Sequence, residues 1–173
     1  MSGTLTSTAD LQERTDVARG QLLLLETDAL TGLPSRRMWD VALREALSGD
    51  DEPVYVALLE LDHFSSYNDR FGRAAGDVFL KRSSRAWSCQ LRPTDMIARL
   101  RGTEFAVIVT GCETRHALHV ARRLVESTLD DETSSVGVAQ WDGAEGPQQL
   151  LRRAREALSA AKLGGRDRAI LAA

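Results

Sequence analysis

The stretch that most constrains this chain is residues 96–110, MIARLRGTEFAVIVT. Two apolar runs, at 96–100 and 105–109, flank the polar link RGTE, where Gly102 supplies the glycine that a tight turn needs. Apolar runs joined in this way are typical of a β-hairpin. Because buried strands fix the direction of the tip between them, such a tip is a rigid place to position chemical groups. An ordinary hairpin with a polar tip explains the same letters, so the rest of the chain has to decide.

Hydrophobic periodicity along the remaining chain predicts alternating helices and strands. Residues 54–61, VYVALLEL, form an apolar run bounded by turn signals, which is typical of a buried central strand. The other expected strands are 134–140 and 168–171, and the expected helices are 9–27, 36–47, 65–71, 77–91, 114–129 and 147–162, with a link over 72–76. The predicted fold class is an α/β (α+β) sandwich with a mainly antiparallel sheet, nearest to the split β-α-β-β-α-β ferredoxin-like arrangement.

Two units are expected, a tail with a stalk helix over 1–27 and a folded domain over 28–173. The apolar positions of the stalk helix suit either packing on its own domain or pairing with a second chain, and both alternatives stay open.

Composition narrows the classes of function. The formal net charge of −3 gives no reason to expect nucleic-acid binding or a polybasic contact with a membrane. No apolar run approaches the ~20 residues of a membrane span, and the first residues lack the pattern of a signal peptide. The two cysteines, Cys89 and Cys112, match no metal-ligand spacing and are expected to be free thiols. We therefore expect a cytoplasmic protein.

Five short patterns, in order and at fitting spacings, resemble the GGDEF domain of diguanylate cyclases. They are DALTGLPSRR at 28–37, LLELDHF at 58–64, NDRFGRAAGD at 68–77, RGTEF at 101–105 and AKLGGRDR at 161–168. The resemblance covers about residues 28–172 and implies the nucleotidyl-cyclase-like fold of that family.

The resemblance also implies a chemistry and a set of site residues. In that family, two GTP molecules on two facing domains are joined into cyclic di-GMP with the help of Mg²⁺. The guanine and phosphate contacts would come from Asn68, Asp77, Gly102, Lys162 and Arg166, and the metal ligands from Glu60, Leu61 and Glu104. Capping residues and solvated cations are the plainer interpretation of the same side chains.

The expected metal centre departs from the family pattern. The family's GGDEF signature corresponds here to RGTEF at 101–105. Glu60 stands where the family has an aspartate, and Thr103 puts a neutral hydroxyl where the signature has an acidic side chain. Arg101 replaces the first glycine of the signature, and Ser65 stands where a phosphate-binding lysine is usual. Displacements of ~1 Å can cost ~100-fold in rate. We therefore expect little or no cyclase activity, with Thr103 and Glu104 at the degenerate catalytic positions.

A second site has kept the family pattern. Arg92 and Asp95 have the composition and spacing of the R-x-x-D product-inhibition site, and Arg123 lies where a further arginine commonly completes it. The resemblance implies that this site binds cyclic di-GMP, with arginine on a guanine edge or phosphate and aspartate accepting from guanine. A helix end with exposed charges is the alternative.

The sequence thus supports a degenerate GGDEF domain that binds cyclic di-GMP as a homodimer and signals to a fused domain or a partner protein. The alternatives are a slow cyclase, a GTP-binding domain without turnover, and a dimerisation domain without ligand. Mg²⁺ is expected only where GTP binds, and otherwise no cofactor.

Overall fold

The computed structural model describes residues 26–49 and 52–173, so the predicted stalk helix lies almost entirely outside the described part. A five-stranded sheet runs in the order β2-β3-β1-β4-β5. Its strands are β1 (Val54–Leu61), β2 (Met96–Arg101), β3 (Glu104–Thr110), β4 (Ser134–Gln140) and β5 (Arg168–Leu171). The β4–β5 pair is parallel and the other pairs are antiparallel. The predicted mainly antiparallel α/β fold is therefore confirmed.

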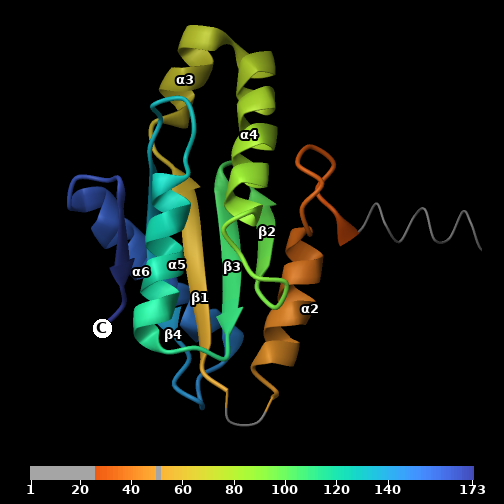
Figure 1. The fold of residues 1–173 in the computed structure, drawn as a ribbon, viewed down its shortest axis with the longest axis vertical. Coiled ribbons are helices and arrows are strands. Elements are labelled where there is room, and N and C mark those ends of the chain that lie inside the picture. The colour runs from red at the N-terminus through yellow and green to blue at the C-terminus, as the bar shows by residue number, and fades with distance from the viewer. Residues whose placement is uncertain (1–25, 50–51) are drawn as a thin grey trace, which may run out of the picture.

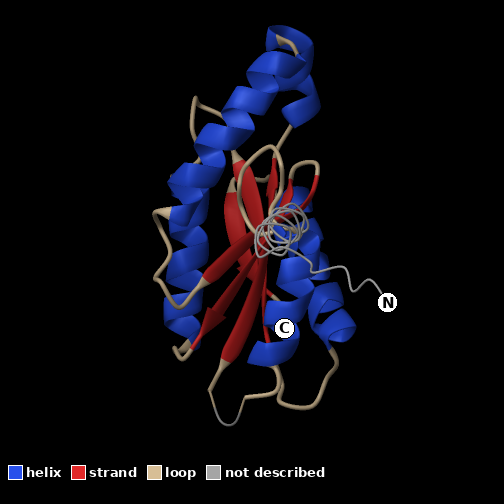
Figure 2. Cartoon of the chain, turned by 90° about the vertical axis from the view of Figure 1, so that its right-hand side faces the viewer, coloured by secondary structure: helices blue, strands red, loops and turns tan. Residues whose placement is uncertain are grey.

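Helices cover both faces of this sheet (Figure 1). They are α2 (Arg36–Ala46), α3 (Phe64–Phe71), α4 (Arg73–Ser88), α5 (Thr114–Glu126) and α6 (Pro147–Leu163). One apolar cluster joins the sheet to α4 and α5, and a second joins the opposite face to α2 and α6. Figure 2 shows the sheet between the two helical layers. No described helix is long and apolar enough to cross a membrane.

The alternation of β1 explains how one strand serves two cores. Tyr55, Ala57 and Leu59 belong to the cluster with α4 and α5, whereas Val56 and Leu58 belong to the cluster with α2 and α6. Successive side chains of a strand point to opposite faces, and here both faces are covered, so the strand is apolar throughout. Glu60 continues the series of Val56 and Leu58 and so faces the layer that contains α6.

The first helical turn of α4 corrects the predicted boundary of this helix. Residues 72–76 were expected to form a link before a helix starting at Asp77, but α4 starts at Arg73. The two glycines favoured the link in the sequence, yet only Gly72 adopts a positive φ, of 84°. Gly76 is helical and buried, and a Cβ there would lie 1.9 Å from Oδ1 of Asn68. The second glycine therefore serves close packing of α3 on α4.

Close packing also places α6. Gly137 lies inside β4, where a Cβ would come within 2.1 Å of the Leu158 nitrogen and 2.2 Å of the Ala154 carbonyl oxygen. A glycine inside a strand often marks a close approach of another backbone. Because α6 lies directly on the sheet at this point, the side chains along its length reach the ends of β1 and β3.

The contacts of Asp28 explain the first motif, DALTGLPSRR at 28–37. Asp28 accepts hydrogen bonds from the Thr31 nitrogen at 2.8 Å and the Thr31 hydroxyl at 2.7 Å, and Nη1 of Arg99 lies 3.0 Å away. Burial raises the pKa of the Asp28 carboxyl, but these hydrogen bonds and the Arg99 charge outweigh it and lower the pKa. The turn before α2 is thereby fastened to β2.

Candidate functional site

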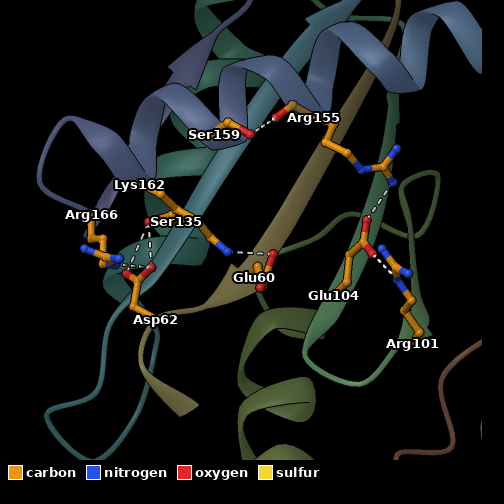
Figure 3. A network of polar contacts seen from close by, with 9 residues as sticks. All are labelled: Glu60, Asp62, Arg101, Glu104, Ser135, Arg155, Ser159, Lys162 and Arg166. Atoms are coloured by element: carbon orange, nitrogen blue, oxygen red, sulfur yellow. Dashed lines mark hydrogen bonds and ion pairs between the residues drawn. The ribbon is translucent and has the colours of Figure 1, made fainter. Parts of the chain in front are cut away.

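Two carboxylates face each other across the central strands. Glu60 of β1 is paired in register with Glu104 of β3, at the end of the hairpin. Like charges directly opposite on a sheet repel each other, and nearby cations offset this repulsion. Figure 3 shows that α6 supplies two of these cations, Arg155 and Lys162. The sheet register and the position of α6 therefore create one charged site.

Each of the two carboxylates has its own cations (Figure 3). Nζ of Lys162 lies 2.7 Å from Oε2 of Glu60. Glu104 is held on both oxygens, because Nε of Arg101 lies 2.8 Å from Oε2 and Nη2 of Arg155 lies 2.8 Å from Oε1. Burial raises the pKa of the Glu104 carboxyl, but the hydrogen bonds from Arg155 and Arg101 outweigh this effect and lower the pKa. Glu104 is therefore an ionised side chain whose two oxygens are both engaged.

The next carboxylate along the chain has a different environment. Asp62 is 3% exposed and accepts hydrogen bonds from the hydroxyls of Thr133 at 2.8 Å and Ser135 at 2.9 Å. The backbone nitrogen of Asp167 also donates to it at 3.2 Å, and Nε of Arg166 lies 4.0 Å away. Asp62 therefore fastens the segment after α6 to the end of β1, which fixes where Arg166 lies.

A cavity of about 410 Å³ opens between these groups and α3. Its walls include Glu60, Asn68, Thr103, Lys162 and Arg166. The predicted metal-binding Leu61 lines it as well, while Gly102 and Glu104 line an adjoining cavity of about 290 Å³ with Glu60 and Thr103. Gly102 has a positive φ of 45°, which a glycine adopts without strain. Oδ1 of Asn68 is buried and has no hydrogen-bond partner within the described structure.

Asp77 lies apart from this cavity wall. It is exposed on α4, one residue after the Gly76 that contacts Asn68, and it does not line the cavity. Within the described ranges, no group of three or more His, Cys, Asp or Glu side chains is arranged to hold a metal ion. The roles of Glu60, Leu61 and Glu104 in metal binding stay predictions.

A second group of charged residues lies at the turn from α4 to β2. The backbone nitrogen of Arg92 donates to Oδ2 of Asp95 at 3.0 Å, while Oδ1 of Asp95 is buried without a partner in the described chain. The guanidinium of Arg92 contacts Nε2 of His116 on α5. Arg123 donates to the carbonyl and side-chain oxygens of Gln90 just before the turn.

The charges of Arg92, Asp95 and Arg123 act on the pKa of His116. Its pKa is lowered, first by burial and then by the positive charge of Arg92, with a further lowering from Arg123 and an opposing effect of Asp95. Of the three residues predicted to bind cyclic di-GMP, Arg92 contacts this imidazole, whereas Asp95 and Arg123 act on its pKa through their charges. Their role in binding stays a prediction.

Comparison with known proteins decides the family. The family model described as "Diguanylate cyclase, GGDEF domain" matches residues 25–168, which include the hairpin and all five motifs. The chain belongs to the GGDEF domain family. This GGDEF domain is 33% identical over 155 residues to the diguanylate cyclase DgcP of Pseudomonas aeruginosa, covering 82% of the chain and 23% of that protein. It is also 33% identical over 163 residues to the response regulator PleD of Caulobacter vibrioides, covering 84% of the chain and 36% of PleD. The chain thus spans only about a quarter to a third of the length of these relatives.

Solved structures agree with the fold of this GGDEF domain. The coiled coil and GGDEF domain of DgcB from Caulobacter crescentus, in complex with c-di-GMP, matches with a TM-score of 0.89 at 26% identity, covering 95% of each chain. The diguanylate cyclase SiaD of Pseudomonas aeruginosa, in complex with its activator SiaC, matches with a TM-score of 0.82 at 31% identity. That match covers 95% of this chain and 69% of SiaD.

Sequence reasoning missed two residues of this GGDEF domain that contact predicted ones. Arg155 holds Glu104, and His116 contacts Arg92. A signal for both was present, because Arg155 precedes Lys162 by seven residues and His116 precedes Arg123 by seven residues. Residues seven apart lie on the same face of a helix, so each predicted cation marks the face that carries the missed residue.

Proposed function

We propose that this GGDEF domain is a cyclic di-GMP-binding signalling module with little or no cyclase activity. The observation that carries the proposal is the pairing of Glu104 with Arg101 and Arg155. A cation that needs Glu104 as a ligand has to displace two guanidinium groups, and Thr103 beside it offers only a hydroxyl. The signature turn therefore lacks a free anionic ligand where the family chemistry uses one.

The turn at Arg92 supports the binding half of the proposal. Arg92 is exposed and has N–H donors for a guanine edge or a phosphate, and one carboxylate oxygen of Asp95 has no hydrogen-bond partner among the described residues. The related DgcB was solved with c-di-GMP, and the shared fold makes the same ligand the first to test here. We place the ligand at Arg92, Asp95 and Arg123.

Calorimetric titration of the whole chain with cyclic di-GMP tests the binding. Arg92→Ala should weaken binding by about 10- to 100-fold, since hydrogen bonds to charged groups contribute ~1.5–3 kcal/mol. Arg115→Ala is the matched control, because Arg115 lies on α5 beside His116 and its one ion pair within residues 26–49 and 52–173 is with Glu113, at 3.4 Å. Absence of binding at high protein concentration, or equal losses in both variants, would refute the proposal.

GTP binding is the second candidate, because Glu60, Asn68, Lys162 and Arg166 line one cavity. We propose that Glu60 and the Leu61 carbonyl would hold a Mg²⁺ ion brought in with the nucleotide, since Mg²⁺ prefers oxygen ligands and keeps several waters. The ion would offset phosphate charge. Asn68 would contact guanine, Lys162 and Arg166 would bind phosphates, and Asp77 would approach the base from α4.

Thermal melting with GTP and Mg²⁺ separates the two candidates. Ligand that binds only the folded state raises stability by ~2.7 kcal/mol at a hundredfold excess over its dissociation constant. A shift with GTP that Lys162→Ala removes and Arg92→Ala leaves would favour this second site. Chromatography of the products then shows whether GTP is turned over, in which case Glu60→Ala should stop the reaction.

We propose, finally, that the domain acts as a homodimer and passes its signal to a fused domain or a partner protein. The structure of SiaD with its activator SiaC provides a precedent in a relative for regulation by a partner. Light scattering on the same samples, with and without cyclic di-GMP, tests the dimer. A monomer under both conditions would contradict it.

A further inference from the structure

We propose that a cavity with three arginines beside the signature hairpin binds a small anion that carries two or more phosphate groups. The cavity measures about 540 Å³ and is lined by Arg36, Arg101, Gln148, Leu151 and Arg155. None of these residues lines the cavity with Lys162 and Arg166 or belongs to the turn at Arg92. The inference therefore goes beyond the proposed function and places its ligand in a different cavity, although two of its lining residues, Arg101 and Arg155, are the ones that hold Glu104.

Three elements bring the arginines together. Arg36 is the first residue of α2, Arg101 is the last residue of β2, and Arg155 lies in the middle of α6. The turn before α2 is fixed to β2 by the Arg99–Asp28 ion pair and by a hydrogen bond from the Arg99 nitrogen to the Pro34 carbonyl at 3.1 Å. The start of α2 is thus held close to the strand that ends in Arg101. The fold, rather than a sequence motif, gathers the three cations.

The cluster has more positive than negative charge. Arg36 pairs with Asp40 at 2.9 Å, while Arg101 and Arg155 share the single carboxylate of Glu104. Three guanidinium groups are thus matched by two carboxylates, which leaves one positive charge in excess. Arg36 and Arg101 both donate through Nε, and their terminal Nη groups have no hydrogen-bond partner among the described residues.

These free groups fit phosphate chemistry. A guanidinium presents parallel N–H donors at a spacing that matches phosphate oxygens. Gln148 adds an amide from the first turn of α6, where the helix carries partial positive charge. Among the described residues that line the cavity, Leu151 is the one apolar side chain, so the cavity suits a charged ligand better than an apolar one. Donors on three elements favour a chain of phosphates over a single carboxylate.

Binding in this cavity would act on the signature turn. The ligand would draw on the guanidinium groups of Arg101 and Arg155 that also hold Glu104, so the anion and Glu104 compete for the same donors. Removing the charge of Glu104 should therefore strengthen anion binding rather than weaken it. A purely structural role of the three arginines would not produce this effect.

Pyrophosphate is the probe, titrated calorimetrically into the whole chain in a metal-free buffer. Arg36→Ala and Arg155→Ala should each weaken binding at least about fivefold, whereas Glu104→Gln should strengthen it by about fivefold, as for ~1 kcal/mol of charge interaction. Arg37→Ala and Arg152→Ala are the matched controls. They remove the same charge from exposed positions on α2 and α6 that do not line the cavity.

Further ligands show which part of the anion is recognised. GTP and ATP should bind alike in the absence of metal, since the proposed contacts reach only phosphates, and inorganic phosphate should bind more weakly than pyrophosphate. Melting curves without ligand confirm that each variant is folded. Because Arg36→Ala and Arg155→Ala test the same cavity, the proposal can still be tested if one of these two variants does not fold.

Three results would overturn the proposal. The first is no binding of pyrophosphate at millimolar concentration. The second is an equal effect of Arg155→Ala and Arg152→Ala, which would indicate general surface charge. The third is that Lys162→Ala abolishes binding while Arg155→Ala leaves it unchanged, which would place the anion in the cavity lined by Lys162 and Arg166. Cyclic di-GMP binding by Arg155→Ala should be unchanged, so this proposal and the one for Arg92 can fail separately.

Discussion

The signature hairpin and the turn at Arg92 lie at opposite ends of β2, and they use their charges in opposite ways. At the hairpin, Glu60 and Glu104 are matched by Lys162, Arg101 and Arg155. At the turn, an oxygen of Asp95 is buried without a hydrogen-bond partner among the described residues, and the guanidinium of Arg92 contacts the His116 side chain rather than a carboxylate. Charges matched within the protein stabilise the fold, whereas charges left with free donors or acceptors are the ones a ligand can use.

Restoring the family residues at the hairpin should remove this difference. In the variant with Glu60→Asp, Arg101→Gly and Thr103→Asp, the site regains a free acidic side chain and loses one cation that holds Glu104. Conversion of GTP to cyclic di-GMP should rise on the order of 100-fold, which corresponds to ~2.7 kcal/mol in the barrier. Product formation with Mg²⁺ is measured by chromatography. A rate equal to that of the unchanged chain would show that the cause of low activity lies outside the hairpin.

A change at Asp95 tests whether the free oxygen at the turn belongs to a ligand site. Asp95→Asn preserves the shape and an acceptor for the Arg92 nitrogen, but its amide group would oppose the N–H donors of guanine. Affinity for cyclic di-GMP should fall about tenfold. Calorimetry of Glu104→Gln provides the comparison, since a matched carboxylate at the hairpin should leave this affinity within about twofold.

The two regions should also respond to different ranges of pH. The pKa of Glu104 is lowered in the folded chain, because the hydrogen bonds of Arg155 and Arg101 outweigh burial. The unfolded chain then binds the proton first, so the stability from Glu104 is present at neutral pH and is lost as pH falls from about 5 through the lowered pKa. The pKa of His116 is lowered by burial and by Arg92. The unfolded chain again binds the proton first, so the free energy of unfolding also decreases as pH falls from about 7.

Denaturant unfolding across this pH range measures both effects. Glu104→Gln should flatten the plot of unfolding free energy against pH in the acidic range, and His116→Gln should flatten it near pH 6. Each variant should keep the pH dependence that comes from the other residue. The effect of His116 should be the smaller, because His116 lies in a more solvent-exposed environment than Glu104. If His116→Gln leaves the slope near pH 6 unchanged, Arg92 is not held by that imidazole in solution.

Much of the fold could be predicted because its signals are local. The apolar run at β1, the glycine in the hairpin and the turn at Pro93 all act within a few residues. The start of α4 was wrong for the opposite reason. A glycine such as Gly76 disfavours a helix in the sequence, but here it permits the close contact with Asn68, which only the packing of α3 on α4 reveals.

The sequence by itself determined the order of helices and strands along the chain and the family, and it predicted the residues of the two candidate sites, because periodicity and motif spacing are properties of the chain. Only the tertiary structure decided which charges meet. Arg155 and Glu104 are 51 residues apart along the chain, and the close approach of α6 to Gly137 helps bring them together. An ion pair needs its charged atoms within a few ångströms of each other, and the number of residues between two side chains does not say how far apart they lie in space. The pairing of Glu104, and with it the proposal of a signalling role, therefore rests on the folded chain.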